Sequence, residues 1–224
     1  MANNEAHKKP LNDPKITAAN AKVSMDLKIQ NTYSNLNVQN YGAPSLECFS
    51  KALKGYFQLK SQGVITNDKL TIIDFSLSST KKRLWVIDME KNEVLIHSLV
   101  SHGLKSGGEF ATNFSNVLES NKSSLGFYLT GETYQGKHGL SLKLDGLEKG
   151  FNDKARDRAV VIHGADYVSE RFITQQGRLG RSLGCPAVPM EIHQNLINTI
   201  KENSCLFIYH PSRIVNEVSE SLAS

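Results

Sequence analysis

The sequence lacks any apolar run long enough to cross a bilayer. Hydrophobic residues make up 39% of its 224 positions, but nowhere do they form the stretch of about 18 apolar residues that a membrane-spanning helix requires. Residues 1–20 also lack the apolar centre of a secretory signal peptide. We therefore expect no transmembrane segment. If the protein works outside the cytoplasm, we expect this chain to be a mature form without its export signal.

Cysteine is scarce, and its three residues stand in different sequence contexts. An odd number of cysteines (Cys48, Cys185 and Cys205) leaves at least one thiol outside any intramolecular disulfide. Cys48 lies on the apolar face of an expected helix and Cys205 in an apolar strand, so both are expected as small core residues. Cys185 stands between Gly184 and Pro186, which predicts a tight turn because neither neighbour suits a helix or a central strand.

Charge is moderate and only slightly unbalanced. The formal net charge is +4 and the isoelectric point about 8.9, which is compatible with an anionic polymer as partner. No dense stripe of Lys and Arg with interleaved aromatic residues appears, so nucleic acid is not expected as a partner.

Hydrophobic periodicity divides the chain into four parts. Residues 1–44 are polar and punctuated by proline, which predicts a flexible N-terminal arm. Ser45 and the following apolar residues at spacings of three and four predict a helical segment, 45–66, packed on the rest. From residue 67 the period shortens to that of strands. We expect a domain over 67–213 and a C-terminal tail over 214–224.

The fold class follows from the count of strands. Short apolar runs begin near residues 70, 83, 93, 126, 141, 159 and 205, and 191–203 has the period of a helix. Many strands with few helices predict a mainly β domain, a sandwich or a partial barrel, preceded by the N-terminal helical segment.

His163 and Cys185 form the candidate catalytic pair. An apolar strand over 159–162 delivers His163, and the turn that carries Cys185 follows 22 positions later. A cysteine nucleophile needs an imidazole close in space, not in sequence, and backbone N–H groups for the oxyanion. Seven Lys and Arg residues lie between Lys149 and Arg181, and we expect their charge to favour the thiolate.

These residues and several further motifs resemble those of a known family, the YkuD-type L,D-transpeptidases of bacterial cell walls. The similarity is greatest to their divergent murein L,D-transpeptidase catalytic domain branch and covers roughly 71–211. The matching motifs are Ser-His-Gly at 101–103, Phe-Ser-Asn at 114–116, Ser-Leu-Gly-Phe-Tyr at 124–128, Gly-Lys-His-Gly at 136–139, His-Gly-Ala-Asp at 163–166 and Gly-Arg-Leu-Gly-Arg-Ser-Leu-Gly-Cys-Pro at 177–186.

The resemblance implies a transferase of cell-wall biogenesis that acts on peptidoglycan stem peptides in the cell envelope, in the periplasm, and that is a carbapenem target. The thiolate of Cys185 would attack the stem tetrapeptide before its terminal D-alanine, form a thioester, and transfer the acyl group to an amine. His163 would serve as base and then as acid. The family needs no cofactor and no metal. The sequence gives no indication of the oligomeric state.

Further roles are implied for residues around this pair. The N–H groups of Gly184 and Cys185 are the expected oxyanion donors, and the hydroxyl of Ser182 is expected to brace the turn. The expected substrate-binding residues are Arg178, Arg181, Gly164, His138 and Tyr128. Two positions depart from the family pattern: Ala187 replaces an arginine, and Leu183 replaces a histidine or arginine. Arg178 and Arg181 are therefore the expected contacts of the substrate carboxylate.

Three other interpretations remain open on the sequence alone. Water in place of the amine would make the protein an L,D-carboxypeptidase. A catalytically silent module that binds peptidoglycan is a second alternative. Zinc held by Cys185, His163 and His138 is a third, although no Cys-x-x-Cys or His-x-x-x-His pair accompanies them. Asp166 is a possible orienting partner of His163.

Overall fold

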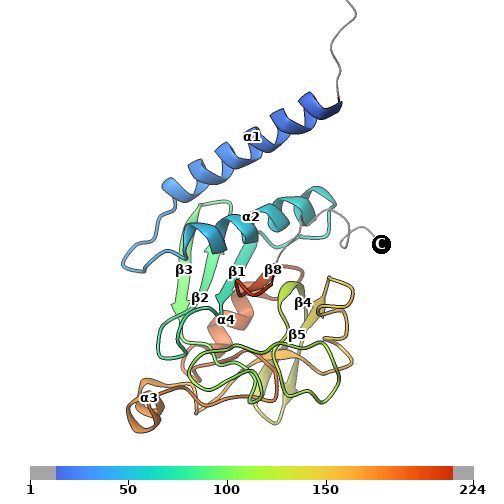
Figure 1. Ribbon diagram of the computed structural model, residues 1–224. Coiled ribbons are helices and arrows are strands. Elements are labelled where there is room, and N and C mark those ends of the chain that lie inside the picture. The colour runs from blue at the N-terminus through green and yellow to red at the C-terminus, as the bar shows by residue number, and fades with distance from the viewer. Residues whose placement is uncertain (1–13, 214–224) are drawn as a thin grey trace, which may run out of the picture.

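A computed structural model describes residues 14–213 (Figure 1). Its elements, in chain order, are α1 (Pro14–Ser34), α2 (Leu46–Ser61), β1 (Lys69–Asp74), β2 (Leu84–Asp88), β3 (Glu93–Ser98), β4 (Gly126–Gly136), β5 (Gly139–Gly146), β6 (Val161–Gly164), α3 (Glu170–Gln176), β7 (Ala187–Val188), α4 (His193–Ile200) and β8 (Cys205–Tyr209). The mainly β fold class predicted from the sequence is confirmed.

All the strands of the described chain belong to one sheet in the order β3-β2-β1-β8-β4-β5-β6-β7. The pairs β1–β8 and β6–β7 are parallel, and the other neighbours are antiparallel. The two edges of the sheet approach each other, because Ser101, just after β3, forms an antiparallel bridge with Ala187 in β7. The sheet is therefore nearly closed, as a partial barrel.

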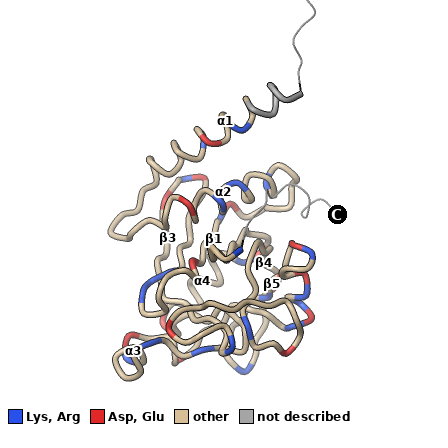
Figure 2. The backbone as a smooth tube through the Cα atoms, viewed as in Figure 1, with Lys and Arg blue, Asp and Glu red and all other residues tan. Residues whose placement is uncertain are grey.

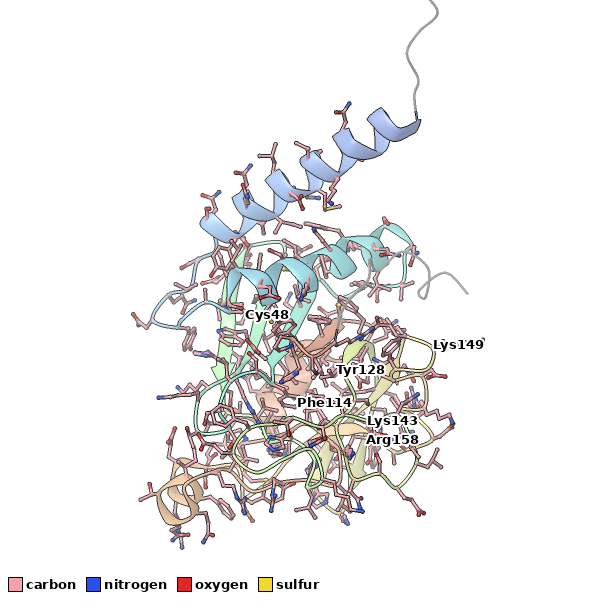
Figure 3. All side chains as sticks on the ribbon, viewed as in Figure 1. Cys48, Phe114, Tyr128, Lys143, Lys149 and Arg158 are labelled. Atoms are coloured by element: carbon pink, nitrogen blue, oxygen red, sulfur yellow. The ribbon has the colours of Figure 1, made fainter. Side chains whose placement is uncertain are left out.

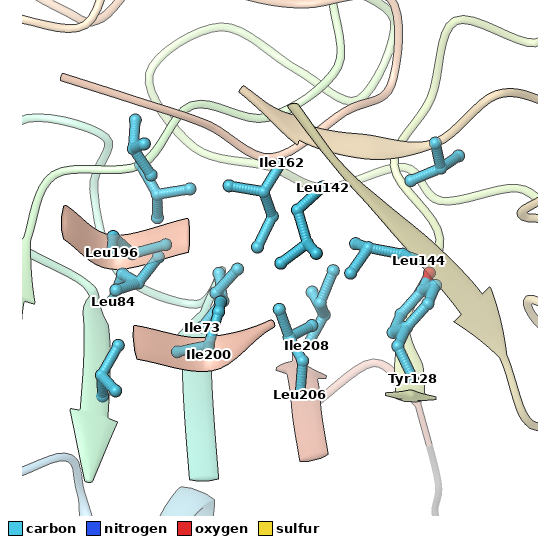
Figure 4. Packing of buried hydrophobic residues seen from close by; sticks show 14 of the residues in the cluster. Ile73, Leu84, Tyr128, Leu142, Leu144, Ile162, Leu196, Ile200, Leu206 and Ile208 are labelled. Atoms are coloured by element: carbon cyan, nitrogen blue, oxygen red, sulfur yellow. The ribbon is translucent and has the colours of Figure 1, made fainter. Parts of the chain in front are cut away.

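The main core lies between α4 and the sheet (Figure 4). Leu196 and Ile200 of α4 belong to the same buried cluster as Ile73 of β1 and Ile208 of β8. Residues of β1 and β8 are buried on both faces of the sheet, which is why both strands are continuous apolar runs without alternation.

The opposite face of β1 and β8 is covered by α2. Ser45 caps this helix by accepting a hydrogen bond from the N–H of Cys48 at 3.3 Å, and Cys48 is fully buried, as predicted. The apolar side of α2 shares a buried cluster with Phe127 and Phe207. Helix α2 thus packs on the sheet, and its burial removes a large apolar area from water.

The N-terminal arm contains a helix that the sequence analysis did not predict. Helix α1 lies along α2 (Figure 1), where Ile29 is buried and Lys54 pairs with Asp26 at 2.9 Å. Its charged and apolar residues follow no clear helical period, so the pattern gave no signal for it. The chain then runs past β2, where the indole N–H of Trp85 donates to the carbonyl of Gly42 at 2.6 Å.

Two short elements also escaped prediction. Helix α3 has no buried residue, so no apolar face marks it in the sequence; Ser169 caps it by accepting from the N–H of Phe172 at 3.2 Å. Strand β7 has only two residues and lies between Pro186 and Pro189.

The outer parts of the predicted domain scheme lie beyond the described residues. These are the first 13 residues of the predicted arm and the predicted tail, 214–224. None of the helices in the described part combines the length and hydropathy that a bilayer crossing needs. Lys and Arg positions are intermixed with Asp and Glu positions over the same part of the chain (Figure 2).

Replacing Gly55 of α2 by alanine should destabilise the protein, because a Cβ there would lie 2.1 Å from Cζ of Phe127. Overpacking a core costs about 1–3 kcal/mol, while the better helix propensity of alanine recovers at most about 1 kcal/mol. We expect a lower free energy of unfolding in urea denaturation. The control is Gly42→Ala, where a Cβ would meet nothing within 4 Å. Equal stability of the two variants would contradict this packing of α2.

Candidate functional site

Cys185 lies in the turn that precedes β7, and its side chain is partly exposed. Its Sγ is 3.6 Å from the carbonyl oxygen of Ala159 and accepts from the backbone N–H of Val161. Val161 is the first residue of β6, and Ala159 lies just before it. The sulfur therefore sits at the amino end of the strand that carries His163.

The hydroxyl of Ser182 braces this turn from inside. It donates to the carbonyl of Cys185 at 2.6 Å and accepts from the N–H of Gly184 at 3.0 Å. Gly184 has a φ of +129°, and a Cβ there would lie 2.9 Å from the carbonyl oxygen of Lys122, so only glycine suits the position. The brace expected for Ser182 is present in the geometry.

The hydrogen bond from Gly184 to Ser182 corrects the expectation that the N–H of Gly184 is an oxyanion donor. Because the N–H of Gly184 is bonded to Ser182, it does not point freely at a ligand as an oxyanion donor would. The N–H of Cys185 makes no hydrogen bond to another described residue. It is the donor that the turn leaves available.

The extended segment after β3 holds the turn from outside. The N–H of Ser101 donates to the carbonyl of Ala187 at 2.8 Å, and the N–H of Ser182 donates to the carbonyl of His102 at 3.1 Å. Ser123 adds a side-chain contact, since its hydroxyl donates to the carbonyl of Gly184 at 3.2 Å. The Ser-His-Gly motif at 101–103 is thus a backbone support for the residues on both sides of the thiol.

His163 is buried in β6 with a defined tautomer. Its Nδ1 lies 2.9 Å from the carbonyl oxygen of Gly164; because a carbonyl only accepts, the proton is on Nδ1 and the lone pair is on Nε2. Gly164 therefore orients the imidazole, the role considered for Asp166. Burial lowers the pKa of His163, which keeps the ring neutral and able to accept a proton.

The strand pairing places His163 and Cys185 on neighbouring segments. His163 is two residues beyond Val161 in β6, a rise of about 6.6 Å along a strand, and alternate residues share one face of a sheet. β6 and β7 are parallel neighbours, with His163 opposite Ala187. The two members of the predicted pair thus come from adjacent segments of the same sheet edge.

His138 lies directly against the imidazole of His163. Its ring stacks on that of His163 with centroids 4.5 Å apart and planes at 24°. His138 is exposed at the turn between β4 and β5, next to Lys137. Of the predicted substrate-binding residues, it is the one that contacts the candidate pair from the solvent side.

Burial dominates the electrostatics of the thiol. It raises the pKa of Cys185, while the N–H of Val161 and the charges of Arg158 and Lys137 act in the opposite direction. Nearby cations therefore favour the thiolate, in the expected direction, but burial outweighs them and the pKa of Cys185 is raised. Most of the seven cations expected to act on the thiol are exposed, where water screens them.

Arg158 is the one of the seven whose charge acts on the thiol, and the sequence did not distinguish it from its neighbours. Its guanidinium is half-buried and donates to the carbonyl of Ser115 at 2.8 Å, to Ser124 at 3.1 Å, and to the carbonyl of Lys122 (Figure 3). A Cβ on Gly184 would lie 3.3 Å from Nη2 of Arg158. One side chain thus ties the 115–124 loop to the turn that carries the thiol.

The remaining predicted substrate-binding residues are placed differently. Tyr128 is fully buried, its hydroxyl bonded to Ser124 (Figure 4), so it belongs to the core and not to a pocket wall. Nη1 of Arg178 donates to the carbonyl of Leu179 at 2.7 Å, and Nη1 of Arg181 donates to that of Gly107 at 2.9 Å. Both arginines hold loop carbonyls near the turn.

A buried arginine excludes His102 as the base. Arg83 is fully buried, and its Nη2 lies 2.8 Å from Nδ1 of His102. Because arginine only donates, Nδ1 must accept, and burial with the charge of Arg83 lowers the pKa of His102 to about 4. In the sequence, Arg83 follows Lys81 and Lys82 and looks like a solvated loop charge. Its burial is a tertiary effect.

The zinc alternative finds no support in the described part of the chain. No group of three or more His, Cys, Asp or Glu side chains there is arranged to hold a metal ion.

The raised pKa of Cys185 predicts an alkylation rate that keeps rising as the pH passes 9.0, the ordinary value for a thiol. We expect peptide mass spectrometry after iodoacetamide treatment to show this, because the thiolate is the reacting form. Arg158→Gln should move the curve to higher pH. Cys48 and Cys205 are internal controls: both are fully buried and should react only after unfolding. A plateau of Cys185 labelling below the ordinary thiol pKa would contradict this electrostatic balance.

Solved structures with detectable similarity are distant. An L,D-transpeptidase from Mycobacterium smegmatis is 12% identical, with 64% of this chain and 59% of that chain covered and a TM-score of 0.39. The helical cell shape determining protein Pgp2 from Campylobacter jejuni is 15% identical, with 70% and 54% covered and a TM-score of 0.44. Bd1075 from Bdellovibrio bacteriovorus is 17% identical, with 64% and 48% covered and a TM-score of 0.39. The matched region thus spans less than two thirds of each of these proteins.

The family itself is identified by sequence. No curated protein matches the chain. Residues 42–209, however, match the family described as the L,D-transpeptidase catalytic domain, YkuD_2. The match includes α2 as well as the sheet, so it begins earlier than the resemblance estimated from motifs. It covers well over half of the chain, and this protein therefore belongs to the family of L,D-transpeptidase catalytic domains.

Proposed function

We propose that this protein is a peptidoglycan L,D-transpeptidase of the cell envelope, with Cys185 as nucleophile and His163 as general base. The observation that supports the proposal is the position of the thiol, on a braced turn that leads into β7 beside the strand that carries the imidazole. The tautomer of that imidazole supports the assignment, because the carbonyl of Gly164 occupies Nδ1 and leaves Nε2 as the acceptor.

In the first half-reaction, Nε2 of His163 takes the thiol proton while Sγ of Cys185 attacks the carbonyl carbon before the terminal D-alanine. The carbonyl oxygen becomes an oxyanion that accepts from the N–H of Cys185. When the tetrahedral intermediate collapses, the C–N bond breaks and the imidazolium gives its proton to the leaving amine. A thioester and free D-alanine result.

In the second half-reaction, an amine of another stem peptide attacks the thioester carbonyl. His163 takes a proton from this amine, the C–S bond breaks, and the thiolate recovers the proton. Because the thiol and the imidazole are both neutral at rest, the proton transfer coincides with attack instead of preceding it. Water in place of the amine would give the carboxypeptidase reaction.

Cations near the pair support the binding of a substrate carboxylate. At the position where many relatives have arginine, Ala187 is fully buried and its carbonyl is bonded to Ser101, so that position cannot contact a ligand. Arg178 and Arg181 keep further N–H donors beyond those that hold loop carbonyls. Lys137, exposed beside His138 and close enough to act on the thiol, is a third candidate.

Slow alkylation does not separate this proposal from a catalytically silent binding module. Burial raises the pKa of Cys185, so even a catalytic thiol reacts slowly with iodoacetamide at neutral pH. Acylation by a carbapenem is the sharper criterion, because it requires the base and the oxyanion donor as well as the thiol.

The protein should form one covalent adduct with imipenem, detected by intact-mass analysis and mapped to Cys185. Cys185→Ala should form none, and Cys48→Ala, a matched control, should react like the unmodified protein if it folds. His163→Ala should acylate more slowly by about a hundredfold or more, because it lacks the general base. An adduct that survives Cys185→Ala, or a His163→Ala rate equal to that of the unmodified protein, would contradict the assignment.

Incubation with purified stem tetrapeptide should yield a cross-linked dimer together with free D-alanine, separated by chromatography and identified by mass. We expect the dimer because the proposed acceptor is an amine. The control is Cys185→Ala, which should leave the tetrapeptide intact. Tripeptide as the sole product would assign the carboxypeptidase reaction instead.

A further inference from the structure

A hollow of about 360 Å³ opens beside the loop that supports the candidate thiol. Its size lies at the lower end of the range for small-molecule sites, about 300–1,000 Å³. Three separate segments form its walls: residues 112–116 with Leu125, residues 150 and 151, and residues 212 and 213.

Arg213, which lines the hollow, is held in an ion pair with Glu148. Nη1 and Nη2 of Arg213 donate to the two oxygens of Glu148 at 2.9 and 2.5 Å. The side chains are 10% and 2% exposed. The pair as a whole carries no net charge, so it does not favour a further anion.

One donor of this pair remains unused. Nε of Arg213 is buried and has no hydrogen-bond partner among the described residues. A buried N–H without a partner is costly, so a ligand oxygen that reached it would be favoured. Arg213 lines the hollow, and Nε thus marks a place for a neutral acceptor such as a hydroxyl or an amide carbonyl.

The other walls are aromatic and uncharged. Phe151 is 50% exposed, and the guanidinium of Arg213 lies 4.3 Å from its ring centroid. Phe114 is partly buried, with its ring 4.9 Å from that of His210. Asn113, Ser115 and Ser212 line the remainder. Apolar ring faces beside amide and hydroxyl groups suit a ligand that has both C–H faces and neutral polar groups.

One side chain, that of Arg158, contacts both the wall of the hollow and the turn that carries the candidate thiol. Ser115 forms part of its wall, and the carbonyl of Ser115 accepts from Nη1 of Arg158 at 2.8 Å. Nη2 of the same guanidinium lies against Gly184, next to Cys185. The hollow and the turn that carries the thiol are thus separated by the width of one guanidinium group.

We propose that this hollow binds an N-acetylated sugar of the glycan strand, the sugar that carries the stem peptide. The proposal rests on the proposed function, because the stem peptide is what connects such a sugar to Cys185. Three extended residues span at most about 10 Å, and one side chain, Arg158, contacts both the wall of the hollow and the turn that carries Cys185. Hydroxyl and acetamido groups match the neutral donors and acceptors, and the sugar ring matches the face of Phe151.

Direct binding tests the hollow without any reaction at the thiol. An N-acetylglucosamine oligomer titrated into Cys185→Ala protein should shift NMR signals of the backbone amides of residues 112–116, 151 and 213. Phe151→Ala should weaken binding about tenfold, the size of effect that corresponds to the loss of one good ring contact. Phe110→Ala is the matched control, since Phe110 is also 50% exposed but does not line the hollow.

A second variant, at Asn113, tests the hollow with little risk to the fold. Asn113 is exposed, and its side-chain amide bonds only to Thr112 among the described residues. Asn113→Ala should also weaken sugar binding while leaving the melting temperature unchanged. No shifts in the hollow, or equal weakening by Phe110→Ala, would overturn the proposal.

A comparison of substrates separates this proposal from the proposed function. The protein should process disaccharide-tetrapeptide with a higher kcat/KM than bare tetrapeptide, and Phe151→Ala should remove that preference mainly through KM. Acylation by imipenem, which carries no sugar, should be unchanged in Phe151→Ala. Imipenem acylation without any preference for the disaccharide would overturn the sugar site alone. Loss of all acylation in the unmodified protein would overturn the proposed function.

Discussion

The backbone pairing between the segment after β3 and the residues around Cys185 is the constraint on which the site depends. Ser101 bonds Ala187 on one side of the thiol, and His102 accepts from Ser182 on the other. This pairing also brings the two edges of the sheet together. The same backbone hydrogen bonds thus close the barrel and position the thiol. A change that opens the sheet edge would therefore also displace the sulfur.

The buried charge beneath this segment explains why it holds its position. Arg83 donates twice to the carbonyl of Val100 and once to His102, and no carboxylate pairs with it among the described ion pairs. A buried guanidinium needs its donors satisfied, and here the backbone supplies most of the acceptors. Moving this segment would leave a charge without partners, which makes its position stiff.

Burial also sets the chemical character of the proposed pair. It raises the pKa of Cys185 and lowers that of His163, so both groups are neutral at rest in place of a preformed thiolate–imidazolium pair. A neutral thiol is a weak nucleophile, and reaction then depends on a substrate that aligns with both groups. Arg158 favours the thiolate only partly, because much of its donor capacity is used to hold the 115–124 loop.

The sequence by itself determined every described strand except β7, helices α2 and α4, the fold class and the candidate pair, because these depend on local periodicity and on residue types such as the glycine and proline around Cys185. Tertiary structure alone decided that Tyr128 is a core residue, that Gly184 gives its N–H to Ser182, and that Arg83 is buried. Those outcomes depend on which distant segments pack together and exclude water, and no local pattern encodes the resulting burial.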